Sequence, residues 1–271
     1  MRSLRLAAFL CGLLSSSVFS VAAPQATSGK PELNLGVQAY KNARYEEAIQ
    51  HFKQAVDLDP TLLNARLYLA TAYAQQYIPG ADTPDNNKFA EQAIDQYKAV
   101  LERDPKNANS VKGIAYLYLQ LKQFDEAKEF YRKATELHPN DPEPYYSVAV
   151  IDWTQTYQPR MEERAKLGLK PQEPLQDKKV CAALKENNSA NIQEGIDNLN
   201  QALKLRPDYD DAMAYMNLMY RERADLQCDD PAARAADLKT ADDWVDLTLA
   251  VKKAKAEKQQ PGSQGITMDQ K

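Results

Sequence analysis

The sequence has few of the residues on which metal centres and nucleophilic catalysis commonly depend. Its 271 residues include only two histidines and three cysteines, so a multi-ligand metal site has little to draw on. No glycine-rich phosphate loop, Gly-x-Ser-x-Gly or His-Glu-x-x-His motif occurs. Lys and Arg number 34 against 38 Asp and Glu, which leaves no positive excess to neutralise phosphates. We therefore expect no catalysis, no cofactor, no metal and no nucleic-acid partner.

Glycine is also scarce, with nine residues in the whole chain. Residues that favour helices, such as Ala, Leu, Lys, Glu and Gln, are common instead. This composition favours an all-α fold over a turn-rich β-architecture. The charged fraction of 27% and the hydrophobic fraction of 44% are typical of a soluble globular chain.

Long hydrophobic runs are absent after the first 23 residues, so we expect no membrane span in the mature chain. Arg2 and Arg5 precede the apolar run 6–14, and Val21-Ala22-Ala23 follows as a small-residue cleavage site. This layout predicts a secretory signal peptide over residues 1–23 and an exported protein, most naturally in the bacterial periplasm. The alternatives are full secretion, an uncleaved membrane anchor, or lipidation at Cys11.

A helical pattern recurs four times along the chain. A small residue is followed at offsets of 4, 7 and 12 by an apolar residue, a small or β-branched residue and a proline. The sets are Ala48, Phe52, Ala55 and Pro60; Ala93, Tyr97, Val100 and Pro105; Ala127, Tyr131, Ala134 and Pro139; and Gly195, Leu199, Ala202 and Pro207. Offsets of 4 and 7 lie on one face of a helix, and the proline ends it.

A second helical segment precedes each of these. It carries a large apolar residue followed by a small one, in the pairs Leu35-Gly36, Leu69-Ala70, Ile114-Ala115 and Val148-Ala149. The small residue allows a partner helix to approach closely. Each unit is thus predicted to be a pair of amphipathic helices, and such pairs bury their apolar faces by stacking.

These positions resemble the tetratricopeptide repeat, a 34-residue helix-turn-helix unit. The resemblance implies a right-handed solenoid of about five repeats, in which the first helices line a concave face and the second helices form the convex back. We expect a linker at 24–28, a solenoid over 29–258 and a flexible tail at 259–271. The expected repeats are 29–62, 63–107, 108–141, 142–209 and a degenerate capping unit at 210–258.

Repeats two and four are longer than 34 residues, and both excesses fall between the paired helices. The first, over 78–87, contains Pro and Gly and is predicted to be a loop. The second, over 157–190, equals one repeat in length, but its prolines argue against a hidden repeat. We expect helical pieces at Arg160–Leu167 and Leu175–Lys185 around an irregular stretch. The mixed charges of 160–166 favour a solvated helix face, with docking onto the scaffold as the alternative.

Two cysteines remain after the signal peptide. Cys181 lies in the long insertion, and Cys228 lies at the turn between the helices of the fifth unit. Turns of this kind lie along one edge of a stacked array, so a disulfide is predicted; two unpaired buried thiols are the alternative.

The resemblance also implies which side chains point into the concave groove. Leu33 and Val37 stand where the co-chaperone clamp for C-terminal carboxylates has polar residues, so that specificity is not predicted. What remains is an apolar and aromatic groove with amides and lysines. The candidate residues are Tyr40, Lys41, Asn64, Asn109, Lys112, Tyr116, Tyr146 and Trp153. Tyr146 and Trp153 have packing against neighbouring helices as an alternative role.

These observations favour a non-catalytic protein–protein interaction scaffold of the cell envelope that binds a peptide segment or a partner protein. The alternative is an envelope accessory protein that binds carbohydrate or another ligand on the same aromatic side chains. An enzyme site in the 157–190 insertion is disfavoured, since that segment has no histidine and one cysteine.

Overall fold

The chain forms an all-α helical repeat, as the sequence predicts. The computed structural model describes residues 28–170 and 173–259, and within these ranges it contains ten helices. They are α1 (Lys30–Lys41), α2 (Tyr45–Leu58), α3 (Leu63–Gln76), α4 (Pro84–Leu101), α5 (Ala108–Gln120), α6 (Phe124–Leu137), α7 (Pro142–Lys166), α8 (Lys178–Leu205), α9 (Asp210–Asp225) and α10 (Pro231–Gln259). The predicted signal peptide, residues 24–27 of the linker and residues 260–271 of the tail lie outside the described residues.

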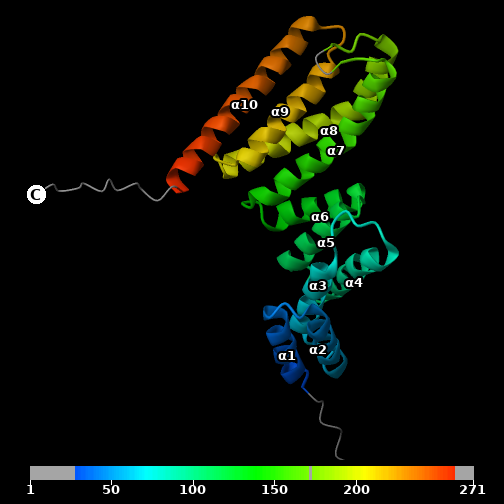
Figure 1. The fold of residues 1–271 in the computed structure, drawn as a ribbon, viewed down its shortest axis with the longest axis vertical. Coiled ribbons are helices and arrows are strands. Elements are labelled where there is room, and N and C mark those ends of the chain that lie inside the picture. The colour runs from blue at the N-terminus through cyan, green and yellow to red at the C-terminus, as the bar shows by residue number, and fades with distance from the viewer. Residues whose placement is uncertain (1–27, 171–172, 260–271) are drawn as a thin grey trace, which may run out of the picture.

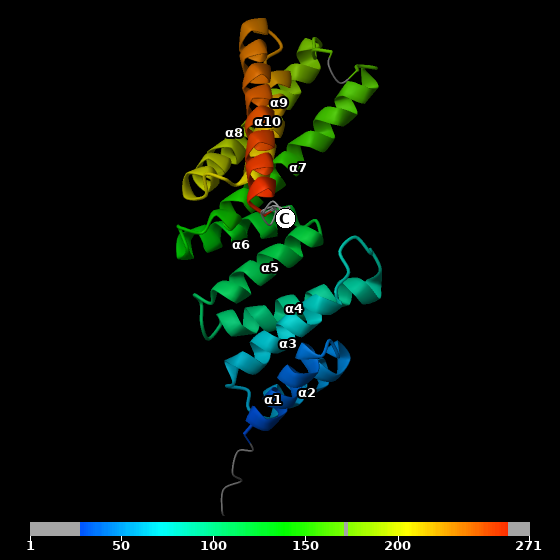
Figure 2. The same cartoon turned by 60° about the vertical axis from the view of Figure 1, so that its left-hand side comes forward.

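Consecutive helices pack as pairs, and the pairs stack in chain order. Each odd-numbered helix packs on the even-numbered helix that follows it, and α2, α4, α6 and α8 each pack on the first helix of the next pair. Helices α1 and α10 therefore lie at opposite ends of the stack (Figures 1 and 2). Because every pair also buries apolar faces against its neighbours, the core continues from pair to pair along the stack.

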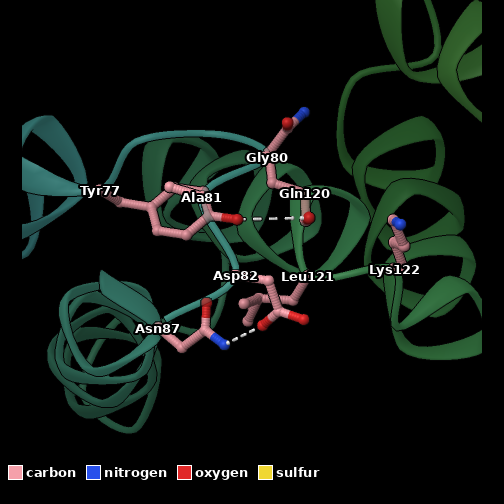
Figure 3. Close-up of a pocket in the computed structure, with 8 residues that line it drawn as sticks. All are labelled: Tyr77, Gly80, Ala81, Asp82, Asn87, Gln120, Leu121 and Lys122. Carbon is pink, nitrogen blue, oxygen red and sulfur yellow. Dashed lines mark hydrogen bonds between the residues drawn. The ribbon is translucent and has the colours of Figure 1, made fainter. Parts of the chain in front are cut away.

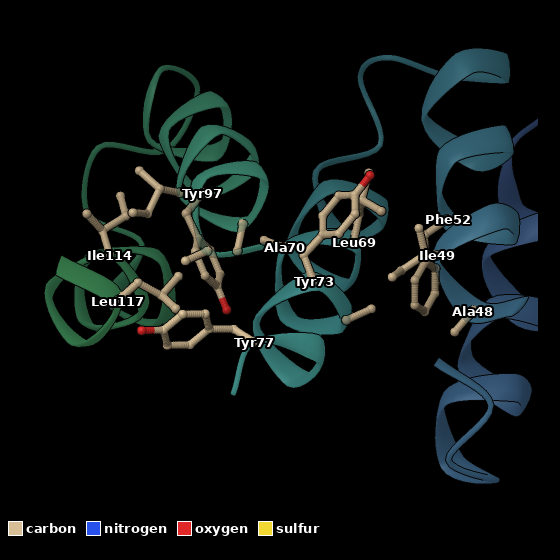
Figure 4. Packing of buried hydrophobic residues seen from close by; sticks show 14 of the residues in the cluster. Ala48, Ile49, Phe52, Leu69, Ala70, Tyr73, Tyr77, Tyr97, Ile114 and Leu117 are labelled. Carbon is tan, nitrogen blue, oxygen red and sulfur yellow. The ribbon is translucent and has the colours of Figure 1, made fainter. Parts of the chain in front are cut away.

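The repeated sequence positions form this core. Ala48, Phe52 and Ala55 are fully buried, and Figure 4 shows how the cluster continues from α2 through α3 toward α5. At Gly36 a Cβ atom would lie only 2.5 Å from the ring of Phe52. This contact explains the small residue of the repeat, because it lets the two helices of the first pair approach closely.

The irregular segment between the helices of the second pair ends earlier than the predicted loop. Helix α4 begins at Pro84, and the hydroxyl of Thr83 accepts a hydrogen bond from the backbone N–H of Asn86 at 3.3 Å. A cap followed by proline in the first turn is a strong start signal. The irregular segment therefore ends at Thr83, inside the predicted loop 78–87. Asn86 is itself buried, and its amide closes the loop by donating to the carbonyls of Ile78 and Ala81.

The insertion in the fourth pair lengthens both of its helices. The helical piece predicted at 160–167 is helical as far as Lys166, but it continues α7, which runs from Pro142 to Lys166 with Pro159 inside it. Of the piece predicted at 175–185, residues 178–185 are helical and form the start of the long helix α8. Proline in a helix removes one backbone hydrogen bond. The contacts of the residues that follow Pro159, described below, hold this part of α7 against α9.

A disulfide joins the long hairpin to the last helix pair. Cys181 of α8 and Cys228 of the α9–α10 turn are bonded, with their Cα atoms 6.3 Å apart. The bond closes a separation of 47 residues along the sequence. It fixes the extended part of α8 beside the end of α9.

We predict that replacing both Cys181 and Cys228 by serine lowers the free energy of unfolding by about 2–4 kcal/mol, because the unfolded chain regains the freedom that the cross-link removes. Urea unfolding of the double variant and of the unreduced protein measures the difference. A reducing agent should destabilise the unmutated protein alone; equal sensitivity of the two proteins to the reducing agent would contradict the prediction.

Candidate functional site

The inner surface of the stack is lined by the first helix of each pair. Helix α1 contacts α3, α3 contacts α5, and α7 contacts α9. Within the described ranges, no comparable contact joins neighbouring even-numbered helices. Helices that lie closest to one another are on the inside of a curved array, so α1, α3, α5, α7 and α9 form what we call the inner surface.

In the first three pairs, most of the predicted groove residues are open to solvent. Lys41, Asn64 and Asn109 are exposed, and Tyr116 keeps 46% of its surface accessible. Tyr40 is half-buried, and its ring packs edge-on against that of Tyr45, with centroids 5.3 Å apart. This part of the inner surface thus presents an ammonium group, two amides and an aromatic ring.

Lys112, also predicted for the groove, has a partner at the neighbouring pair. Its ammonium group forms an ion pair with Asp141, which precedes α7. Burial raises the pKa of Asp141, but hydrogen bonds from Lys112 and from the backbone N–H of Glu143 outweigh this and hold the pKa below its usual range. Lys112 therefore helps to join the third and fourth pairs.

Tyr146 and Trp153 belong to an aromatic cluster. The ring of Tyr146 lies 5.0 Å from that of Tyr209 and 5.5 Å from that of Tyr215, and Trp153 lies 5.6 Å from Tyr215 and 4.7 Å from Tyr157. Burial raises the pKa of the Tyr146 hydroxyl well above its usual value. Both side chains thus pack on neighbouring helices, as in the alternative role, and both remain partly exposed.

Two residues of this cluster, Tyr209 and Tyr215, were not among the predicted groove residues. The hydroxyl of Tyr209 donates to Glu143 at 2.6 Å, and the same carboxylate accepts from Arg206 at 2.8 Å. Tyr209 immediately precedes α9 and Tyr215 lies within it, and α9 stacks directly on α7. The stacking of α9 on α7 could have indicated these residues, because aromatic residues on consecutive first helices face the same surface.

The charged run after Pro159 has two faces: Glu162 and Lys166 are exposed, as favoured for a solvated face, whereas Arg160 and Arg164 are largely buried against α9. The guanidinium of Arg160 bonds Glu222 and Asp225 of α9, both at 2.7 Å, and Arg164 bonds Asp225 at 2.9 Å. Arg164 also donates to the backbone carbonyls of Lys170 and Glu173. The alternative, docking of the insertion onto the scaffold, is therefore correct. The spacings place the two arginines on one helix face and the two carboxylates on another, but the sequence does not show that these faces meet.

A second buried network joins the third and fourth pairs. Lys128 of α6 bonds Asp152 of α7 at 2.5 Å and Glu194 of α8 at 2.9 Å, and Arg132 reaches the same glutamate at 2.5 Å. Burial raises the pKa of the fully buried Asp152 to about 7, although Lys128 opposes the shift. In the network that Arg160 forms with α9, burial likewise raises the pKa of Glu222 to about 7, although the charge of Arg160 opposes the shift. Asp152 and Glu222 are therefore both buried between packed helices.

A small polar pocket of about 110 Å³ lies where the loop after α3 meets the α5–α6 turn. Figure 3 shows the hydroxyl of Tyr77 pointing at the backbone carbonyl of Gln120, to which it donates at 3.3 Å, and Asn87 donating to Asp82 at 2.9 Å. The pocket walls are therefore tied together by their own hydrogen bonds. Lys122, at its rim, has a left-handed backbone with φ of 58°.

Two further features bear on chemistry. Among the described residues, no group of three His, Cys, Asp or Glu side chains is placed to hold a metal ion. No helix in the same ranges has the length and apolar character needed to cross a membrane.

Comparisons with known proteins agree with this geometry. Two models described as tetratricopeptide repeat match residues 33–62 and 90–151. No curated protein matches the chain. A crystal structure of MamA has a TM-score of 0.58 at 12% identity and covers 86% of this chain and 96% of its own. A MamA fragment from Desulfovibrio magneticus RS-1 gives 0.56 at 14% identity, covering 84% and 97%.

A third similar structure is that of YrrB, titled a TPR protein with an unusual peptide-binding site. It has a TM-score of 0.51 at 15% identity and covers 83% of this chain and 91% of its own. At these identities, the structural likenesses support the fold alone.

The raised pKa values of Asp152 and Glu222 predict a pH dependence of stability. Between the ordinary carboxyl pKa of about 4 and the folded value of about 7, the folded state holds protons that the unfolded chain has lost. Stability should therefore fall as pH rises through this window. We expect the melting temperature of Asp152→Asn to fall less between pH 5 and pH 8, and that of Asp152→Asn with Glu222→Gln to fall least. Asp246→Asn, at an exposed site, is the control and should keep the full decline.

Breaking the Arg160 network should destabilise the hairpin strongly. Arg160→Met leaves Glu222 buried without its main partner, which we expect to cost about 3–5 kcal/mol in unfolding free energy. The control Arg221→Met removes an exposed pair with Asp242 and should cost about 0–1 kcal/mol. Similar losses of unfolding free energy in the two variants, measured by urea unfolding, would show that the buried network stabilises the protein no more than the exposed pair does.

Proposed function

The chain is a tetratricopeptide repeat protein, and we propose that it is a non-catalytic interaction scaffold whose inner surface binds a peptide segment or a partner protein. The open row of side chains over the first three pairs carries this proposal. Asn64 and Asn109 lie on consecutive first helices, and the exposed ring of Tyr116 lies on the second of these. A protein partner fits such a surface better than a small molecule does, because the row extends across several helices, whereas small-molecule sites are concave and enclosed.

The chemistry of the row suits an extended or helical peptide. The amides of Asn64 and Asn109 can donate to and accept from a peptide backbone. Tyr116 supplies a large contact area at a low cost in side-chain entropy, which is typical of residues that dominate binding energy. Lys41 adds a positive charge at the N-terminal end, so we expect a partner with an acidic residue near that end.

The aromatic cluster supports the C-terminal half of the same surface. Tyr146 and Trp153 are held by Tyr209 and Tyr215 and keep part of their rings accessible. Rigid, partly exposed aromatic rings can bind apolar side chains with little loss of freedom. We propose that Tyr146 and Trp153 form a rigid, preformed part of the binding surface rather than act as separate anchor residues.

A non-catalytic role is supported by where the perturbed groups lie. Active sites gather groups with shifted pKa values in open clefts. Here Asp152 and Glu222, the two carboxyl groups with the largest such shifts, are engaged by Lys128 and Arg160 inside helix contacts.

We place the protein in the cell envelope, with the bacterial periplasm as the proposed compartment. The support is the predicted signal over residues 1–23 and the Cys181–Cys228 bond, since disulfides persist mainly in oxidising compartments.

The test is capture of partners from a native envelope extract by crosslinking, with variants that leave the core intact. We expect Tyr116→Ala to weaken binding of a captured partner at least about tenfold, since a central aromatic residue commonly supplies this much. Asn109→Ala should weaken it less. The control Glu129→Ala alters an exposed residue of α6, on the outer side of the stack, and should bind normally. Equal capture by all three variants would move the site away from the inner surface.

A further inference from the structure

One position of the repeat changes its chemistry along the inner surface. It is the second residue of each first helix from α3 onward, and its occupants in chain order are Asn64, Asn109, Glu143 and Asp211. The row thus begins with amides and ends with carboxylates. Glu143 already has partners, since it accepts from Arg206 and Tyr209. The carboxylate of Asp211 is exposed and has no hydrogen bond or ion pair with any other described residue.

Asp211 lies beside the aromatic cluster. Tyr215 follows it by four residues, which places the two side chains on one face of α9. Burial raises the pKa of the Tyr146 and Tyr215 hydroxyls, and the negative charge of Asp211 adds to both shifts. This carboxylate is therefore close to two phenol rings, and both rings remain partly exposed.

Elsewhere in the C-terminal half, a tyrosine beside a carboxylate binds an arginine. Three sets of side chains share this arrangement: Arg206 with Tyr209 and Glu143, Arg223 with Tyr220 and Asp237, and Arg160 with Tyr157 and Glu222. In this order, the guanidinium carbon lies 4.4, 4.5 and 5.6 Å from the ring centre. A nitrogen of the same group lies 2.8, 2.6 and 2.7 Å from the carboxylate. The ring and the carboxylate thus serve one guanidinium together.

Tyr215 and Asp211 form the same arrangement without the arginine. In each of the three sets, the arginine and the tyrosine are three residues apart in the sequence. The residues three before and three after Tyr215 are Ala212 and Leu218. Within the described part of the chain, Asp211 forms no ion pair and Tyr215 no cation–π contact.

The lysines of α10 that come near this turn of α9 bind another carboxylate. Lys255 lies 2.6 Å and Lys252 3.9 Å from the carboxylate of Asp210. Consecutive side chains on a helix do not share a face, so Asp210 points toward α10 while Asp211 points toward Tyr215. Among the described residues, no lysine of α10 forms an ion pair with Asp211. The position beside Tyr215 is thus left for a cation from outside the chain.

We propose that Asp211 and the ring of Tyr215 bind the guanidinium group of an arginine in the peptide that occupies the inner surface. This inference rests on the proposed function and adds to it the identity of one bound side chain. The carboxylate supplies charge-assisted hydrogen bonds, and the ring supplies a cation–π contact. Lys41 lies on the first helix, at the other end of the surface. The bound peptide therefore directs its acidic residue toward α1 and its arginine toward α9, which fixes its direction.

The test uses peptides selected on the mature protein from a phage-displayed random library. Those whose binding Tyr116→Ala weakens occupy the inner surface, and they are the probes. We expect them to contain an arginine whose replacement by citrulline, a neutral group of the same shape, weakens binding at least about tenfold. Asp211→Asn should weaken the arginine peptide to the same degree, and on this variant the citrulline replacement should have no further effect.

The matched control is Asp95→Asn, which removes an exposed carboxylate of α4 and should bind the arginine peptide normally. Both aspartates are exposed, so the variants should fold, and helical circular dichroism checks this. Inner-surface peptides without an arginine, or an equal citrulline effect on the unmutated and Asp211→Asn proteins, would overturn the inference and leave the proposed function standing. A loss shared by Asp95→Asn would overturn it as well, because net charge would then explain the effect. Failure to select any peptide that depends on Tyr116 would contradict the proposed function, and this inference with it.

Discussion

Each helix pair in this chain has apolar side chains on both of the sides that face its neighbours, and these can be buried only by another pair. Phe52 illustrates the constraint, since its ring lies against Gly36 within its own pair and is stacked at 5.6 Å on Tyr68 of the next pair. The core is therefore a continuous row rather than a centre. The order of the helices, the outward-facing ends and the inner surface all follow from this single mode of burial.

The long hairpin of α7 and α8 departs from simple stacking and is fixed differently. Beyond the repeat length it is held to the last pair by the Arg160–Glu222 contact, by Arg164 and Asp225, and by the Cys181–Cys228 bond. Arginine suits this role because its planar group serves several acceptors at once. The ion pairs give the hairpin one orientation against α9, and the disulfide limits its freedom when they break. This anchorage also aligns α7 with α9, where the aromatic cluster forms.

The helices of the repeats could be predicted closely, because residues 4 and 7 positions apart share a helix face and a proline follows the last turn of each second helix. The insertions were predicted less well. The predicted helical piece began after Pro159, whereas α7 contains this proline. A proline costs a helix one hydrogen bond, and the residues of α9 that Arg160 contacts lie far away in sequence. The inner-surface residues divide in the same way. Asn64 and Tyr116 are open as their positions implied, whereas Lys112, Tyr146 and Trp153 meet partners from other repeats.

The sequence by itself determined the helical pairs, their order and the apolar row between them, because helix periodicity and stacking are local rules that repeat along the chain. Only the tertiary structure decided which charges are buried, which cysteines are joined, and which aromatic rings support others. Those outcomes depend on the meeting of side chains that lie far apart in the sequence, such as Arg160 and Glu222, which are 62 residues apart. A charged residue has the same signature in sequence on a solvated face and in a buried pair, and only the presence of a partner within hydrogen-bond distance separates the two.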